Sequence, residues 1–436
     1  MKRLFLLLAC LLLTVTSLFA KVYYVSPDGN DANPGTIDAP FAGLAMAQRM
    51  VAAGDTVYLR GGTYRPTEQD LMGFEAKLYH CVFIMDKSGT DEAHRICYFG
   101  YPGERPVFDL SDILPAEGRI CAFFVKGSYL HFRNFEVVGT HVIYMPGNTQ
   151  SECFSNRGGS HNIYENLAVH DGEAIGFYIL RGSDNLVINC DAYCNFETVT
   201  GDKSGGNVDG FGAHPKLGDK GNAFRYCRSW WNSDDGFDLI HAYESVTIDH
   251  CWAFFNGYRA GTFESAADGN GIKAGGYGMR AERRAPEGEV PRHRVTNCIA
   301  YRNKAGGIYS NHHLGGITFL NNSSFYNRYN YNMVCRKSAS EIVDVNGYDH
   351  VLKNNLSYQP AEAHVIWLGD DGCTVENNSF APTELPLTDA DFVSLDASQL
   401  LQPRLPDGSL PEITLLTPVA TSPLSEARIG HCFEAE

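Results

Sequence analysis

Four aspartates gather in two neighbouring phrases of the sequence. Asp209 lies in the phrase NVDGF, and Asp234, Asp235 and Asp238 lie in NSDDGFD. Carboxylates at this density repel one another unless they are protonated or bind a cation, and a set of hard oxygen ligands favours calcium. One Asp-Gly pair would be explained by a solvated acidic turn. Two aligned pairs favour a metal site, and because no histidine or cysteine recurs at ligand spacing there, calcium is favoured over zinc.

A lysine continues the same register. Glycine followed by an apolar residue recurs at Gly176-Phe177, Gly210-Phe211, Gly236-Phe237, Gly271-Ile272 and Gly307-Ile308. If these apolar residues point inward from short strands, the residues after the last four of them form an outward column of Gly212, Asp238, Lys273 and Tyr309. A lysine beside acidic residues is ordinarily an ion pair. Here the glycines of GNGIKAGG leave space over Lys273 for an extended polymer, as a catalytic base on such a substrate would require.

Only an element that repeats at a fixed interval can place these residues side by side. A second phrase runs in step with the first, as NCDAYCN, YCRSWWN, HCWAFFN and NCIAYRN around Cys190, Cys227, Cys251 and Cys298. Cys227 and Cys251 are 24 residues apart, and Cys251 and Cys298 about twice that, spacings that are typical of a solenoid. Short strands broken by Asn, Gly and Asp, with almost no helical periodicity, predict an all-β fold, a right-handed parallel β-helix with buried asparagine ladders. We interpret these cysteines as free, buried thiols.

The ends of such a solenoid need covers, because an open coil exposes unpaired strand edges. After a strand at 22–25, the sequence predicts a capping helix from about Asp38 to Gly54, with Phe41, Leu44, Gln48 and Val51 along one face. We expect three regions: a signal peptide at 1–20, a parallel β-helix domain with its cap at 21–380, and an extension at 381–436 that packs along the outside.

Composition bounds the function further. The chain has 436 residues, of which 44% are hydrophobic and 20% charged, so it can bury a large core. Lys2 and Arg3 precede an apolar run, which predicts a signal peptide and a secreted or periplasmic protein; Cys10 makes a surface lipoprotein the less favoured alternative. The net charge of −16 disfavours nucleic acid and anionic membranes as partners. We expect a monomer without a membrane span.

Taken together, these motifs resemble those of the family 9 polysaccharide lyases, calcium-dependent enzymes that cleave pectic polymers on a parallel β-helix. The resemblance runs from YYVSPDGNDANPGT through VDGF and NSDDGFDL to GNGIKAGG. It implies that Lys273 is the Brønsted base and that the calcium ligands are Asp209, Asp234, Asp235 and Asp238. His214 and Ile272 depart from the family pattern, which would place a small or basic residue and an aromatic residue there.

The reaction that the resemblance implies is β-elimination on a galacturonate unit. A base removes the proton at carbon 5, and the glycosidic oxygen leaves from carbon 4. Calcium can neutralise the sugar carboxylate and stabilise the intermediate. Weaker candidates for sugar contacts are His214, Arg280, Tyr309, Asn311, His312 and His313. Among them Arg280 ranks first, because a guanidinium can bind a carboxylate with two hydrogen bonds. The sequence favours pectate as the substrate.

Three alternatives stay open. The first is a rhamnogalacturonan I lyase of the same family, since that polymer also presents a galacturonate carboxylate. The second is an inverting hydrolase related to polygalacturonases, which also carry an Asp in an NxDG phrase and an Asp pair about one coil later; chelation should abolish a lyase and spare such a hydrolase. The third is a carbohydrate-binding β-helix without activity, which would bind pectic fragments and not shorten them.

Overall fold

The computed structural model describes residues 20–143, 149–199, 205–280 and 289–435. The expected signal peptide at 1–20 therefore lies almost entirely outside the described residues. Within those residues, the helices are all too short or too polar to cross a bilayer.

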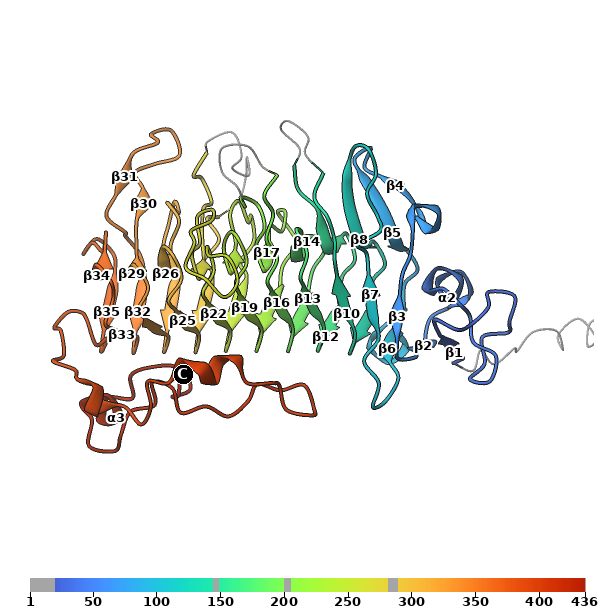
Figure 1. Ribbon diagram of the computed structural model, residues 1–436. Helices are drawn as coiled ribbons and strands as arrows, with labels where there is room; N and C mark the ends of the chain where they lie inside the picture. Colours follow the sequence, from blue (N-terminus) through green and yellow to red (C-terminus); the bar gives the residue numbers. More distant parts are fainter. Residues whose placement is uncertain (1–19, 144–148, 200–204, 281–288, 436) are drawn as a thin grey trace, which may run out of the picture.

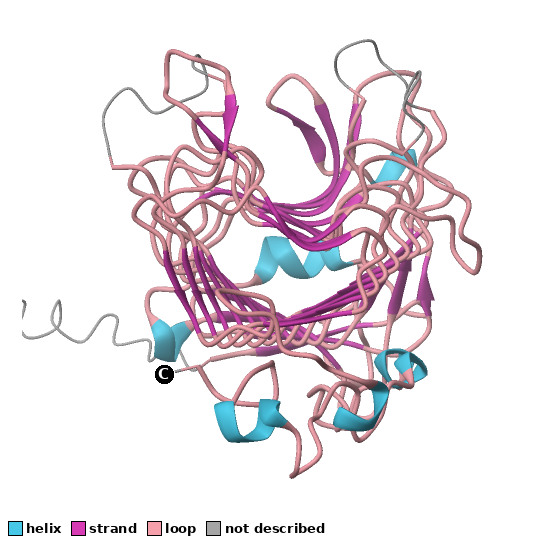
Figure 2. Ribbon diagram, turned by 90° about the vertical axis from the view of Figure 1, so that its left-hand side faces the viewer, coloured by secondary structure: helices cyan, strands magenta, loops and turns pink. Residues whose placement is uncertain are grey.

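The described chain winds into a parallel β-helix, as the sequence predicts (Figure 1). Each coil contributes short strands to long sheets, and Figure 2, which looks along the solenoid, shows the strands stacked into distinct faces with loops rising on either side of the upper sheet. The first sheet contains β1 (Val22–Val25), β2 (Thr56–Leu59), β6 (Ile96–Gly100), β9 (Leu130–Arg133), β12 (Ile163–Glu165), β15 (Leu186–Ile188), β18 (Ala223–Arg225), β21 (Thr247–Asp249), β24 (Arg294–Thr296), β27 (Thr318–Leu320), β32 (Val351–Lys353) and β35 (Thr374–Glu376).

Two more sheets complete the coils. The second contains β3 (Thr63–Tyr64), β7 (Val107–Asp109), β10 (Glu136–Val138), β13 (Ala168–His170), β16 (Asp191–Tyr193), β19 (Arg228–Trp230), β22 (Trp252–Phe254), β25 (Ile299–Tyr301), β28 (Ser323–Phe325) and β33 (Leu356–Tyr358). The third contains β4 (Gly73–Glu75), β5 (Tyr79–Met85), β8 (Arg119–Val125), β11 (Glu152–Arg157), β14 (Ile175–Arg181), β17 (Phe211–Ala213), β20 (Phe237–Asp238), β23 (Ile272–Lys273), β26 (Gly306–Tyr309), β29 (Tyr329–Asn332) and β34 (Ala363–Ile366). A short antiparallel pair joins β30 (Cys335–Arg336) to β31 (Asp344–Val345).

The interior of the third sheet is a column of stacked rings. Phe154, Phe177, Phe211 and Phe237 follow one another with centroids 4.8–5.1 Å apart and nearly parallel planes. Ile272 pairs in register with Phe237 and continues the column. All are almost fully buried. The apolar residue of each Gly-apolar pair therefore points inward, which fixes the residue after it on the outer face.

The corners of the coils are held by buried asparagine ladders, as predicted. The Nδ2 atom of Asn232 donates to Asn256 Oδ1 at 3.1 Å, and that of Asn256 donates to Asn303 Oδ1 at 3.1 Å. Each asparagine amide thus donates a hydrogen bond to the asparagine of the next coil, so these buried polar groups are paired. The thiols of Cys190, Cys227, Cys251 and Cys298 are free and fully buried, as interpreted from the sequence.

The N-terminal cap contains a shorter helix than expected. Helix α2 (Leu44–Met50) begins after Gly43, so the predicted start near Asp38 is wrong. The reason is that Phe41 is held in an extended conformation: its N–H donates to Tyr24 O, and its carbonyl accepts from Ser26 N, each at 2.9 Å. Phe41 and Leu44 are nevertheless buried, as the pattern predicted. Short 3-10 turns η1 (Glu68–Asp70) and η2 (Glu92–His94) follow.

The C-terminal segment packs on the outside of the coils, beneath β22 and β25 in the view of Figure 1. It contains η4 (Asp389–Asp391), η5 (Ala397–Leu401) and α3 (Pro423–Ala427). Its Leu400, Leu415 and Leu424 are fully buried in one apolar cluster with Phe254 and Ile299 of the second sheet. The tail therefore covers a different face from the third sheet, whose outer surface stays available.

Candidate active site and metal centre

The outer face of the third sheet carries the column that the sequence predicts. The in-register partners are Gly212 and Asp238 on β17 and β20, Asp238 and Lys273 on β20 and β23, and Lys273 and Tyr309 on β23 and β26. The strands stack in sequence order, so the expected alignment is confirmed. Neighbouring positions in this column are about 4.8 Å apart.

Three of the aspartates form a compact cluster at the start of these strands. One carboxylate oxygen from each of Asp209, Asp234 and Asp235 lies within 4.8 Å of the others. Asp209 precedes β17, and the other two precede β20. Backbone N–H groups hold the cluster: Asp235 N donates to Asp209 Oδ1 at 3.1 Å, and Asn207 N donates to Asp234 Oδ2 at 2.9 Å. Asp238 lies on β20, three residues after Asp235, and is not part of this trio.

The charges of the cluster are incompletely compensated in the protein alone. Burial, followed by repulsion from Asp238, raises the pKa of Asp209 well above its ordinary value. Burial and Asp235 raise the pKa of Asp234 to about 7, and burial is also the main cause that raises the pKa of Asp238 to about 6. A divalent cation would relieve this repulsion, and an all-oxygen donor set suits a hard cation. The residues present therefore fit a calcium ion.

Lys273 is inserted into the same cluster. Its Nζ atom lies 2.9 Å from Asp235 Oδ2 and 3.3 Å from Asp238 Oδ2, and the residue is 8% exposed. Burial alone would lower the pKa of Lys273, but Asp235 and Asp238 raise it well above its ordinary value. In the protein without a cation, the amine is therefore protonated and bound to two carboxylates.

Asn270 is a site residue that the sequence reasoning missed. Its backbone N and its Nδ2 donate to Asp235 Oδ1 at 2.7 and 2.8 Å, and its Oδ1 accepts from Gly306 N at 3.0 Å. Asp235 is fully buried, so Asn270 and Lys273 together satisfy both of its oxygens. The signal was present in the phrase GNGIKAGG, where the asparagine lies two residues before the strand that carries Lys273.

The weaker sequence candidates divide into two groups. Tyr309 lies beside Lys273, and its ring meets that of His312 edge-on at 6.0 Å; His312 Nδ1 in turn lies 2.7 Å from Asp344 Oδ1. These side chains belong to the same outer face. Asn311 and His313, by contrast, are buried and hold turns. Asn311 Nδ2 donates to Gly275 O at 3.0 Å, and His313 Nδ1 accepts from Gly276 N at 3.2 Å.

The two remaining candidates are His214 and Arg280. His214 follows β17, and its Nδ1 is bound to the hydroxyl of Tyr178 on β14 at 2.9 Å. Arg280 is exposed and adjoins residues 281–288, which lie outside the described chain. Tyr178 itself is a residue that the sequence reasoning missed, although the pair Gly176-Phe177 already placed it in the outward column.

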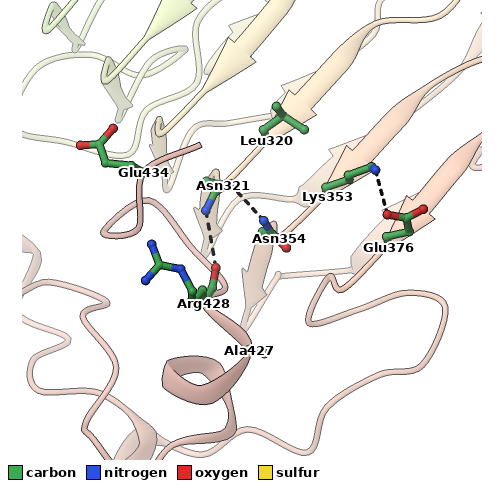
Figure 3. A pocket seen from close by; sticks show the side chains of 8 residues that line it. All are labelled: Leu320, Asn321, Lys353, Asn354, Glu376, Ala427, Arg428 and Glu434. Carbon is green, nitrogen blue, oxygen red and sulfur yellow. Dashed lines mark hydrogen bonds and ion pairs between the residues drawn. The ribbon is translucent and has the colours of Figure 1, made fainter. Parts of the chain in front are cut away.

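A pocket on another face is unrelated to this site. It has a volume of about 450 Å³ and lies between the first sheet and the C-terminal tail, where Asn321, Asn354 and Arg428 meet (Figure 3). Lys353 and Glu376 in this pocket form an ion pair at 2.8 Å. Their charges compensate each other, and neither residue belongs to the sheet that carries Lys273.

Comparison with known proteins identifies the family to which this fold belongs. Residues 23–355 match the family model described as Pel9A-like, right handed beta helix region. The chain is 34% identical over 418 residues to pectate lyase L of Dickeya dadantii (strain 3937), covering 93% of this chain and 86% of that protein. It is 29% identical over 424 residues to pectate lyase PEL9 of Emericella nidulans, covering 91% and 92%.

Two solved structures share the whole architecture. A structure described as rhamnogalacturonan lyase is 45% identical with a TM-score of 0.90, covering 95% of this chain and 100% of that one. The structure of pectate lyase Pel9A is 33% identical with a TM-score of 0.71, covering 92% and 90%. The parallel β-helix, the family-model match and these relatives together place the chain in the class of polysaccharide lyases. Within that class, this chain belongs to the Pel9A-like family, the family 9 polysaccharide lyases.

Proposed function

We propose that this protein is a calcium-dependent lyase that cleaves a galacturonate-containing pectic polysaccharide by β-elimination, with Lys273 as the base. The observation that carries the proposal is the position of the Lys273 amine, 2.9 Å from Asp235 and on the outer face of the sheet. The relatives support the choice of polymer, because pectate and rhamnogalacturonan both contain galacturonate units.

The calcium ligands in this proposal are Asp209, Asp234, Asp235 and Asp238. Support comes from the short distances within the acidic trio and from the raised pKa values of Asp209, Asp234 and Asp238. When bound, calcium would neutralise the substrate carboxylate and stabilise the negative charge that develops beside it.

Lys273 performs the proton transfer. Its neutral amine accepts the proton from carbon 5, the released electron pair forms the double bond between carbons 4 and 5, and the glycosidic oxygen leaves with its bonding electrons and takes a proton from water. Only the neutral amine can act in this way. Because Asp235 and Asp238 keep the amine protonated in the cation-free protein, compensation of their charges is a requirement for activity.

The substrate is one of two polymers. The sequence favours pectate, whereas the higher identity to the rhamnogalacturonan lyase structure supports rhamnogalacturonan I. Parallel digestion of both polymers and comparison of initial rates decides between them. In either case the expected signal peptide at 1–20 would export the enzyme to meet a polymer outside the cytoplasm.

The role of Lys273 is tested by substitution. Lys273→Ala should lose nearly all turnover, by at least about a thousandfold, while calcium binding measured by calorimetry persists, because only the base is removed. Lys273→Arg should restore little, since a guanidinium stays protonated. Turnover is followed by the ultraviolet absorbance of the unsaturated product.

Hydrolysis cannot generate that absorbance, so the same assay separates a lyase from the polygalacturonase alternative. A chelator should abolish the signal, and added calcium should restore it. If Lys273→Ala produced the unsaturated product at near wild-type rate, another group would be the base. If the products were saturated, β-elimination itself would be wrong.

A further inference from the structure

The outward column continues past the metal centre toward the N-terminal end of the solenoid. Tyr178 on β14 is the in-register partner of Gly212, which in turn is the partner of Asp238. A side chain at Gly212 would place its Cβ 2.9 Å from Tyr178 Cδ2. The ring of Tyr178 therefore leans over β17 and lies between its own strand and the acidic cluster, and the glycine is required to make room for it.

Two side chains, His214 and Arg157, contact the ring of Tyr178. The Tyr178 hydroxyl lies 2.9 Å from His214 Nδ1, and the two rings meet edge-on with centroids 5.0 Å apart. The guanidinium of Arg157 lies 5.6 Å from the ring centroid. Burial raises the pKa of Tyr178 and lowers the pKa of His214 to about 3, so this hydrogen bond joins a neutral hydroxyl to a neutral imidazole. Tyr178 as a whole is half-buried.

The charged groups around Tyr178 are committed to one another. Arg157 Nη2 lies 2.7 Å from both oxygens of Glu152, which is fully buried and also accepts from the Tyr79 hydroxyl at 2.8 Å. The amine of Lys216, in the loop after His214, lies over the ring of Tyr243 at 5.0 Å. The surroundings of Tyr178 thus offer an apolar ring and a closed ion pair.

We propose that the ring of Tyr178 is the floor of a sugar subsite that takes an uncharged unit of the polymer by stacking. This inference rests on the proposed function and names the substrate class more closely. A uronate at this position would be desolvated beside an ion pair that is already closed, at a cost in free energy. A 6-deoxyhexose such as rhamnose presents an apolar face to the ring instead. Tyr178 therefore makes the enzyme favour a backbone in which galacturonate alternates with an uncharged sugar.

The test compares two substrates of matched length, an oligosaccharide of the rhamnogalacturonan I backbone and an oligogalacturonate, with calcium present. Tyr178→Ala should raise KM for the rhamnose-containing substrate about tenfold and leave KM for the oligogalacturonate within about twofold, with kcat little changed. Tyr178→Phe keeps the ring and should stay within about twofold of wild type on both. Tyr178→Leu keeps much of the volume without the aromatic face and should behave like the alanine variant.

Tyr326→Ala is the matched control, because Tyr326 is 45% exposed at the turn after β28 in the second sheet. It should change neither KM. An equal loss on both substrates in Tyr178→Ala and Tyr178→Leu, or a loss in Tyr178→Phe as large as that in the alanine variant, would overturn the subsite while leaving β-elimination intact. Absence of unsaturated product from either substrate with wild-type enzyme would instead overturn the proposed function, and this inference with it.

Discussion

The residues of the acidic cluster are protonated more readily in the folded protein than in the unfolded chain. Asp234 has a pKa of about 7 and Asp238 of about 6, against an ordinary value of 3.8. Between these values the folded protein binds more protons than the unfolded chain, so its stability falls as the pH rises. This is the reverse of the behaviour of carboxylates that are paired with a cation.

We therefore expect the stabilisation of the protein by calcium to be larger at high pH than at low pH. In a chelator, the melting temperature should fall by several degrees between about pH 5 and pH 8, and added calcium should recover most of that loss at pH 8 and little at pH 5. Differential scanning calorimetry at both pH values measures this.

Asp209→Asn is the variant to compare, because the amide oxygen can still accept from Asp235 N. It removes one negative charge from the cluster, so the loss of stability in chelator should shrink, and calcium affinity should fall by at least about tenfold. A melting temperature in chelator that is flat across this pH range would contradict the assigned repulsion.

The strands of the site are positioned by contacts between the glycines of the Gly-apolar pairs and the asparagines of the second repeated phrase. A Cβ at Gly271 would lie 2.6 Å from Asn303 Nδ2 and 2.6 Å from Gly307 O, and one at Gly236 would lie 2.8 Å from Asn256 Nδ2. At Gly236, Gly271 and Gly307 the glycine is thus required because an asparagine of the ladder fills the corner beside it. Since Gly271 is two residues before Lys273, the ladder also sets the position of the amine.

Gly271→Ala should therefore disturb the site without touching its chemistry. The added methyl group must displace Asn303 or backbone, which should destabilise the protein by about 1–3 kcal/mol and lower kcat about tenfold through the shift of β23. Gly43→Ala is the control, because its nearest contact is 3.7 Å and its φ is −118°. Thermal melts and initial rates of both variants test this. Wild-type activity in Gly271→Ala would show that β23 does not depend on the ladder.

These contacts explain how much could be predicted from sequence. The spacing of the two phrases carries the coil repeat, so the parallel strands, the outward column and the asparagine ladders could all be predicted. The helix start could not, because it depends on the hydrogen bonds of Phe41 to β1 rather than on helical pattern. The network of Tyr79, Glu152 and Arg157 was not predicted, because these three residues lie outside the two repeated phrases.

At the scale of the whole molecule, one buried ion cluster ties the tail to the coils. Asp191 on β16 accepts from Arg228 Nη2 at 2.7 Å and from Arg404 Nη2 at 2.7 Å. Arg228 Nη1 also donates to Gln402 O at 2.7 Å, so both guanidinium groups reach between the sheet and the tail. Burial alone would raise the pKa of Asp191, but Arg404 and Arg228 lower it. This carboxylate is therefore charged, and it neutralises the buried guanidinium groups of Arg228 and Arg404.

Asp191→Asn should consequently release the tail. The substitution leaves the charges of Arg228 and Arg404 without a carboxylate in a buried place, which typically destabilises a protein by about 3–5 kcal/mol. We expect a lower melting temperature and faster proteolytic cleavage within 381–436, measured by limited proteolysis and mass spectrometry. Calcium affinity should stay unchanged, because the tail covers the second sheet, whereas the proposed calcium ligands lie at the third. Glu376→Gln is the control: it breaks an ion pair with Lys353 whose side chains are 60% and 39% exposed, so it should alter stability by less than about 1 kcal/mol. If Asp191→Asn melted like this control, the apolar contacts of the tail alone would hold it on the solenoid.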